Sequence, residues 1–426
     1  MGDSLFEGMS ASVFTKVILM RLADRLRERF PTPGQGDTTR SGGFGYVPAA
    51  WPVEGSPIAP QEMIPTYTGT VTKAISGTVG FGLGRRYAQL AAGASVTFKP
   101  VRCTGFDIEW AAVVTTGASF AYSVDGGAPV TVSTSSARTT STQASNVGDT
   151  TITVAAVQQD WRPGAMVIIE TGGNNETVNI ASVAGNVVTL ATALTKAHAA
   201  GSPVAAHSNG GYLTSVRGLA PGAHTVAITT TTGAFILGVD YYLNDDGKGI
   251  HVYNSGHSGI RADQYLTNGA TDKWSQSVAV RRPAAIVCDL MINDSGVQTP
   301  AQVVANLAAL KARIDADVAA RGLPRPSWVQ VIPYEIDPAN NRYQGTPWAS
   351  YVDAIHGWAR TDTTGPGGSS GVFVIDLGRR MPRSDQNVGP YGDPTAYYLA
   401  SDKIHPLDTG TDAFALWSSR ALPIEQ

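Results

Sequence analysis

The sequence has little cysteine, little net charge and no long apolar run. Cys103 and Cys288 are its two cysteines; they could form a disulfide or a reactive thiol, but two buried thiols are the favoured reading. The formal net charge of −3 provides no basic surface, so we expect no nucleic-acid partner. No segment approaches the roughly 20 apolar residues that a membrane span requires. The N-terminal residues lack a charged region followed by an apolar core, so we also expect no signal peptide.

Glycine and proline are abundant, with 47 and 25 residues in a chain of 426. Together with 42% hydrophobic residues, they are typical of a globular protein that is rich in turns. The chain is longer than one ordinary domain needs, so we expect two or three domains.

Residues 11–30 predict an amphipathic helix. Apolar side chains recur at every fourth position, at Phe14, Ile18, Leu22, Leu26 and Phe30. Pro31 and Pro33 would end this helix. We assign residues 1–45 to the N-terminal part of a domain that is completed later in the chain.

Short alternating runs broken by turns extend from about residue 66 to residue 243. One run, 120–124, leads into Asp125-Gly126-Gly127, a turn sequence. This pattern predicts an antiparallel β-sandwich, in two parts that we place at 60–140 and 209–245. Between these parts, residues 141–208 predict a small β-module nested in the sandwich.

From residue 246 the pattern changes to alternating strands and helices. Apolar runs lie at 250–253, 284–290, 328–332 and 372–375. The clearest helix begins at Thr299-Pro300, with an apolar face and a stop at Gly322. The pattern predicts an α/β domain over 246–426, with a parallel sheet covered on both faces. The carboxyl ends of its strands are where catalytic groups are expected.

Polar residues at these strand ends could carry out acyl transfer. Such a reaction needs a hydroxyl nucleophile, a base, a group that orients the base, and donors for the oxyanion. Ser4 precedes the first helix, and His405 lies in a loop before the last one.

Four motifs, in this order, resemble those of the SGNH (GDSL) hydrolase family. The matches are Gly2-Asp3-Ser4-Leu5 followed by Gly8, Asn254 with Gly259, Met291-Ile292-Asn293-Asp294, and Asp402-Lys403-Ile404-His405-Pro406. Each motif is short, and the specificity lies in the complete, ordered set. The resemblance covers residues 1–30 and 248–426, and the inserted β-domain is outside it.

The resemblance implies a three-layer α/β/α hydrolase with a flavodoxin-like parallel sheet and a large β-sandwich insertion. Ser4 would be the nucleophile, His405 the base and Asp402 the group that orients it. The backbone N–H groups of Ser4 and Gly259 and the side chain of Asn293 would form the oxyanion hole. The remaining motif residues that would support these groups are Asp3, Asn254 and Asp294. The implied reaction needs no cofactor and no metal.

The sequence departs from the family pattern at two points. Met291 replaces the glycine of the third motif. Members of the family also carry a strand before Gly-Asp-Ser, where this sequence has only Met1. We therefore expect that another chain or a segment of the insertion supplies the missing strand, or that the chain starts short.

Two functions remain open at this stage. The first is an esterase or deacetylase that acts on an envelope polysaccharide or glycolipid, with the sandwich as a docking module. The nested module resembles segments of bacteriophage tail proteins, which favours a virion tail component over a secreted bacterial enzyme. Other tail proteins would then be its partners, and we expect a homo-oligomer, with a trimer as the expected state. The second is a catalytically silent receptor-binding or structural tail protein on a hydrolase fold.

Overall fold

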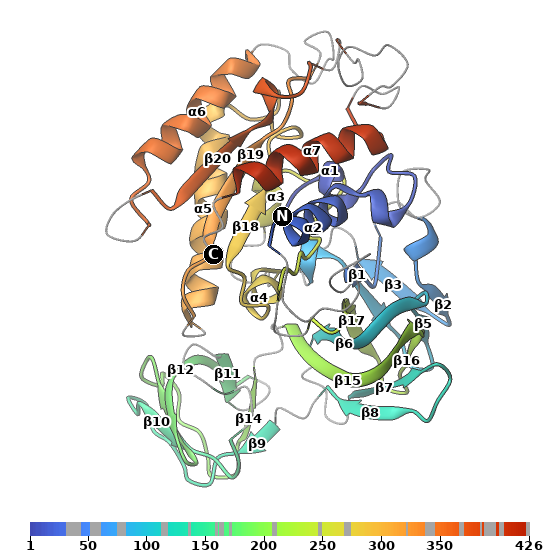
Figure 1. Ribbon diagram of the computed structural model, residues 1–426. Helices are drawn as coiled ribbons and strands as arrows, with labels where there is room; N and C mark the ends of the chain where they lie inside the picture. Colours follow the sequence, from blue (N-terminus) through green and yellow to red (C-terminus); the bar gives the residue numbers. More distant parts are fainter. Residues whose placement is uncertain are drawn as a thin grey trace.

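The computed structural model arranges the strands of its described residues in four sheets (Figure 1). It describes residues 1–30, 44–51, 61–74, 82–111, 118–134, 138–157, 161, 166–169, 173–206, 211–245, 249–267, 274–320, 323–336, 346–365, 370–383, 386, 398–399 and 404–422. Among these residues, no helix combines the length and the apolar character needed to cross a bilayer.

A parallel sheet lies among the helices of the N-terminal and C-terminal regions. Its strands pair in the order β18 (Ala285–Cys288), β19 (Ser327–Ile332) and β20 (Val372–Asp376). Alternate residues of β19 enter different apolar clusters: Trp328 and Ile332 one, Val329 and Val331 the other. The sheet therefore buries both faces. The described part has three strands, fewer than the predicted flavodoxin-like sheet.

Helices cover each face of this sheet. The cluster on the Trp328 face includes side chains from α3 (Ala262–Leu266), α4 (Trp274–Ala279), α5 (Pro300–Ala320) and α6 (Trp348–Thr361). The cluster on the Val329 face includes side chains from α1 (Ser4–Glu7), α2 (Ile18–Arg29) and α7 (Asp408–Ala421). Figure 1 shows α2 and α7 side by side on this face.

The helix predicted from Thr299-Pro300 is confirmed as α5. Thr299 and Gln302 cap its start reciprocally: the Thr299 backbone N–H donates to Gln302 Oε1 over 2.8 Å, and the Gln302 N–H donates to Thr299 Oγ1 over 3.3 Å. Its predicted apolar face is buried, at Val303, Leu307, Leu310, Ile314 and Val318. Gly322, the expected stop, lies outside the described residues.

The single helix predicted over 11–30 is wrong in its first third. Residues Phe14–Lys16 form a short 3-10 turn, and Val17 is extended with φ −65° and ψ 151°, so α2 begins at Ile18. The reason is tertiary packing. Phe14 stacks on Phe44 with ring centroids 4.8 Å apart and belongs to the core of the sandwich, whereas Ile18 belongs to the core of the α/β part.

The N-terminal residues lie between β18 and the 254–257 segment. The Met1 amino group donates to the Val287 carbonyl over 2.7 Å, and Gly2 forms a parallel bridge with Gly256. The position expected for a strand from elsewhere is thus occupied, at this end of the sheet, by Met1 and Gly2 themselves. The run at 250–253, predicted as a strand, forms no strand in the structure. The isolated bridge between Gly2 and Gly256 lies just after it.

The insertion contains two antiparallel sheets packed on one apolar core. The first pairs β15 (Gly211–His224), β6 (Val101–Ala111), β17 (Ala234–Tyr242), β4 (Tyr87–Leu90) and β3 (Val71–Ala74) in that order, with β1 (Gly45–Pro48) also on β17. The second pairs β2 (Thr66–Thr68), β5 (Ser95–Thr97), β16 (Val226–Thr229), β7 (Ser119–Val124) and β8 (Val130–Ser133). The turn after β7 has positive φ at Asp125 and Gly126, as its sequence predicts.

The nested module is a separate six-stranded sheet with its own apolar core. Its order is β10 (Thr151–Thr153), β13 (Val187–Leu190), β12 (Glu176–Ala184), β11 (Met166–Ile169), β14 (Pro203–Ala206) and β9 (Arg138–Thr140). Strand β9 precedes residue 141, the predicted start. Buried His198 bonds to Glu176 over 3.3 Å, so this histidine is part of the module's packing.

A buried arginine joins the sandwich to the α/β part of the chain. Arg281 donates to Glu109 Oε2 over 2.9 Å and to Asp240 Oδ2 over 2.8 Å, and its guanidinium lies over the Tyr46 ring. Desolvation raises the pKa of Asp240 to about 7 although Arg281 opposes that shift. Because removing one partner of a buried ion pair is costly, this cluster fixes where the insertion sits.

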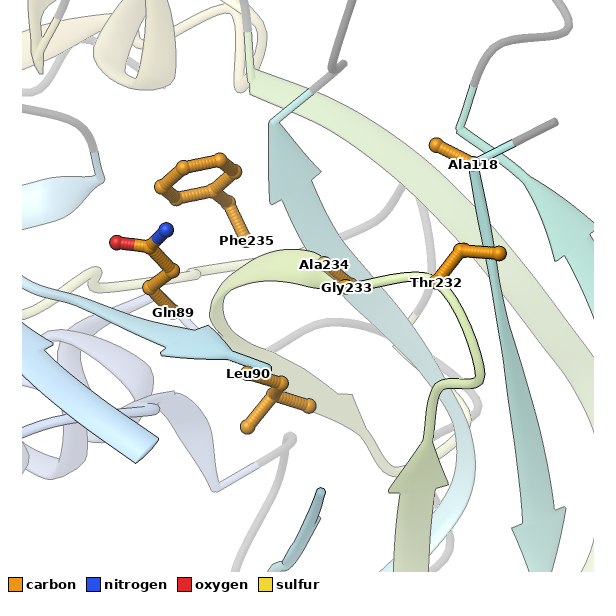
Figure 2. Close-up of a pocket in the computed structure, with 7 residues that line it drawn as sticks. All are labelled: Gln89, Leu90, Ala118, Thr232, Gly233, Ala234 and Phe235. Carbon is orange, nitrogen blue, oxygen red and sulfur yellow. The ribbon is translucent and has the colours of Figure 1, made fainter. Parts of the chain in front are cut away.

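A depression opens at one end of the sandwich. Figure 2 shows the Phe235 ring and the Gln89 carboxamide beside each other, with Leu90, Ala118 and Thr232 along the strands and loop around them. No motif residue lines it.

The prediction of two buried thiols is confirmed, because Cys103 and Cys288 are both buried and both free.

Candidate active site

Ser4 begins helix α1, a single turn that is buried. The side chain of Asp3 caps this turn by accepting a hydrogen bond from the Leu5 N–H over 2.9 Å. Gly8 ends it in the left-handed conformation, with φ 101°, and a Cβ there would lie 2.2 Å from Val17. The Gly-Asp-Ser motif therefore shapes a tight turn with the serine at its first position.

The structure brings Ser4 and His405 together from opposite ends of the chain. His405 Nε2 lies 2.8 Å from Ser4 Oγ, and both side chains are buried. Neighbouring contacts hold the His405 loop: the Tyr334 hydroxyl donates to the Ile404 carbonyl, and the Leu407 N–H donates to Tyr398 over 2.9 Å. This is the nucleophile–base pairing that acyl transfer requires. Asp402 lies outside the described residues, so its role remains a prediction.

The second motif forms a loop directly against α1. Asn254 Oδ1 accepts the Gly256 N–H over 2.8 Å, and the His257 N–H donates to the Gly2 carbonyl over 3.0 Å. A Cβ on Gly256 would lie 2.2 Å from the backbone nitrogen of Glu7, so only glycine fits. Gly259 has φ +75° and faces open space, which leaves its surroundings clear for a ligand.

The third motif orients the first. Asn293 Nδ2 donates to Asp3 Oδ2 over 3.1 Å and to the Ile260 carbonyl over 3.3 Å, so it links the serine turn to the Gly259 loop. Asp294 Oδ1 accepts the Ala262 N–H over 2.8 Å at the start of α3. Met291, in the place of the motif glycine, is buried in an apolar cluster. The oxyanion roles of Ser4, Gly259 and Asn293 remain predictions.

Asp289 is a site residue that the sequence analysis missed. Its Oδ1 accepts the Asp3 N–H over 3.2 Å, and a Cβ on Gly2 would overlap that oxygen at 1.8 Å. Burial, with the charge of Asp3 next in importance, raises the pKa of Asp289 well above its usual value. In the sequence, the position of Asp289 near the end of the apolar run 284–290 could have marked it as a candidate site residue.

Glu7 and Arg86 form a second group that the sequence analysis missed. Glu7 Oε2 accepts the Ser258 N–H, and its Oε1 lies 3.4 Å from Arg86 Nη1 in a fully buried ion pair. Desolvation raises the pKa of Glu7 to about 7 even though Arg86 opposes the shift. Arg86 belongs to the insertion, and no motif marks it.

His257 is packed rather than exposed. Its Nδ1 bonds to the Gly84 carbonyl, and burial lowers its pKa to about 4, so its ring is neutral near pH 7. Among the described residues, no three His, Cys, Asp or Glu side chains are grouped so as to hold a metal ion. The histidine in contact with Ser4 is His405 and not His257.

Asp294 should make the folded state sensitive to pH. Burial raises the pKa of Asp294 to about 7, so the folded chain holds this proton more tightly than the unfolded chain, and stability falls as the pH rises from about 4 to about 7. In Asp294→Asn, which keeps an oxygen acceptor, we expect the free energy of unfolding at pH 8 to exceed that of the wild type by roughly 2–4 kcal/mol. The difference should shrink as the pH is lowered to 5.

Thermal unfolding at the two pH values measures this effect. The control is Asp353→Asn, an exposed carboxylate on α6, which should leave the melting temperature unchanged at both. An Asp294→Asn variant that is equally destabilised at pH 5 and pH 8 would contradict the account, since the loss would then not depend on ionisation.

Comparisons with known proteins bear on the fold. Neither a protein-family model nor a curated protein matches this sequence. Among solved structures, a peptidoglycan O-acetylesterase superposes with a TM-score of 0.51 at 13% identity, covering 98% of this chain and 88% of its own. That likeness shows that this chain shares its overall fold with that esterase.

Two other solved structures are similar at lower scores. A family 2 carbohydrate esterase with a carbohydrate-binding domain, from Corynascus thermopiles, has a TM-score of 0.30 at 14% identity, covering 83% of this chain and 98% of its own. A putative GDSL-like lipase from Bacteroides ovatus has a TM-score of 0.23 at 10% identity, covering 76% and 81%.

Proposed function

We propose that this protein is a serine esterase that removes an acyl group, such as acetyl, from a polysaccharide or glycolipid of the cell envelope. The observation that carries the proposal is the 2.8 Å contact between His405 Nε2 and Ser4 Oγ, made by residues 401 positions apart. In this proposal the parallel sheet with helices on both faces is the α/β/α core of an SGNH hydrolase.

The proposed reaction has two halves. Ser4 Oγ attacks the ester carbonyl carbon while His405 Nε2 accepts the hydroxyl proton, and collapse of the tetrahedral intermediate returns that proton to the leaving sugar alcohol. Water then attacks the acyl-serine, gives a proton to His405, and releases the carboxylic acid with Ser4 restored. Asp402 would orient the imidazole and stabilise its charged form.

The oxyanion would be held at the start of α1. The Ser4 and Gly259 N–H groups and the Asn293 amide are the proposed donors. The hydrogen bond from Asn293 to Asp3 places that amide beside the serine turn, and the bond to Ile260 places it beside the Gly259 loop. These two bonds use both N–H groups of the amide, so donation to the oxyanion would replace the longer bond to the Ile260 carbonyl. Donors of this kind typically lower the barrier by about 3–4 kcal/mol each.

The glycan part of the proposal rests on the solved structure that carries the fold argument, which is a peptidoglycan O-acetylesterase. The sandwich supplies a large second surface that could dock a polymer. To test this, the intact protein would be incubated with O-acetylated envelope polysaccharides, and released acetate would be measured, with the same polymers after chemical de-O-acetylation as blanks. We expect acetate from at least one acetylated polymer and none from the blanks.

A second candidate remains, in which the chain binds its receptor without turnover. We propose the catalytic reading because Ser4 and His405 are in contact. Retention of the protein on an acetylated polymer without acetate release would favour the catalytically silent alternative.

We further propose a phage-tail location and a homo-oligomer, such as a trimer, with other tail proteins as partners. The support is the resemblance of the nested module to tail-protein segments, and light scattering of the purified protein would test the oligomer.

A further inference from the structure

One short segment of the insertion lies against the proposed oxyanion loop. Residues 82–86 include the 3-10 turn Leu83–Arg85, which ends the connection into β4. The Gly84 N–H donates to Ser255 Oγ over 2.7 Å, and the Gly84 carbonyl bonds to His257 Nδ1. A Cβ on Gly84 would lie 2.7 Å from the Gly256 carbonyl, so the two backbones are in direct contact.

Arg86 extends this contact to the nucleophile helix. It is fully buried, donates to the Asn254 carbonyl over 3.3 Å, and pairs with Glu7 over 3.4 Å. Glu7 in turn accepts the Ser258 N–H, one residue before Gly259. One guanidinium thus holds the start of the 254–259 loop directly and its end through Glu7.

We propose that Arg86, supplied by the inserted β-domain, is a positioning residue that fixes the 254–259 loop against the Ser4 helix, so that the insertion completes the active site. This inference rests on the proposed esterase function. Buried hydrogen-bonded charges are costly to leave unpaired, so the loop, Glu7 and Arg86 hold one another in a single arrangement. The substrate need not touch Arg86.

The expected consequence is a loss of turnover rather than of binding. Without Arg86, the Gly259 N–H would no longer be held where the oxyanion forms, and that interaction is made only in the transition state. For Arg86→Met we expect kcat for a small chromogenic acetyl ester to fall about 10- to 100-fold, with KM changed less than about 3-fold. Arg86→Lys, which restores the charge, should recover part of that loss.

Arg85→Met is the matched control. Arg85 is the neighbouring buried arginine, and its guanidinium donates to the Gln264 carbonyl of α3. We expect this variant to lose stability while its kcat per folded molecule stays close to that of the wild type. If Arg86→Met does not fold, Glu7→Gln removes the same ion pair with little change of shape and should lower kcat in the same direction.

Hydrogen exchange provides a readout that does not depend on activity. Backbone amides of 254–259 should exchange at least about tenfold faster in Arg86→Met than in Arg85→Met. A kcat within threefold of the wild type, or unchanged exchange in the loop, would overturn the inference. A wild type without esterase activity whose loop still loosens in Arg86→Met would refute the esterase proposal and leave the positioning role supported.

Discussion

Ser4→Ala is expected to lower kcat for an acetyl ester by about 10⁴- to 10⁶-fold, since the nucleophile and its base act as a unit and removal of either one eliminates the covalent route. The fold should survive, because the cap of α1 is made by Asp3 and not by the Ser4 hydroxyl. Initial rates at saturating ester, normalised to folded protein, measure the effect.

Ser12→Ala is the control for this substitution. Ser12 is exposed, and its hydroxyl donates to Asp408 Oδ2 over 2.7 Å at the start of α7. Its replacement should leave kcat close to that of the wild type. If Ser4→Ala kept a tenth or more of the wild-type kcat, the catalytic serine would have to be another residue.

Gly256→Ala is expected to have the second largest effect, on both stability and turnover. The added Cβ would lie 2.2 Å from the Glu7 nitrogen and 2.5 Å from the Phe6 carbonyl carbon, and both are backbone atoms of α1. The loop and the helix must therefore move apart, at a cost of about 3 kcal/mol or more. A displacement of about 1 Å at such a site can reduce kcat by roughly 100-fold.

Urea unfolding and ester kinetics measure these two losses. Gly357→Ala is the matched control, because that glycine lies in α6 and a Cβ there meets no atom within 4 Å. It should be neutral or stabilise by up to about 1 kcal/mol. A Gly256→Ala variant as stable and as active as Gly357→Ala would show that the loop does not need this close approach.

The local patterns of the sequence predicted part of the fold well. The apolar face and capping residues specify α5, and Asp125-Gly126 specifies the turn after β7, because both depend on neighbouring residues alone. The helix predicted over 11–30 failed at Phe14, whose ring is recruited into the sandwich core. The spacing of apolar residues within 11–30 could not predict this packing, since it depends on residues far away in sequence.

The candidate site shows the same division. The motifs predicted Ser4 and His405, and the structure brings these two side chains into contact. The pairing of Glu7 with Arg86 could not be predicted, because 79 residues separate them and a single arginine in a β-rich segment carries no signal. The filling of the strand position by Met1 and Gly2 also needed three-dimensional contacts to be seen.

Labelling of the intact protein with a fluorophosphonate probe, followed by peptide mapping, tests the central claim most directly. The probe reacts only with a serine whose neighbouring base makes it nucleophilic. The account predicts a label on Ser4 that is lost in Ser4→Ala and in His405→Ala. A folded wild-type protein that takes no label, or takes it on another residue, would contradict the claim that Ser4 and His405 form a working catalytic pair.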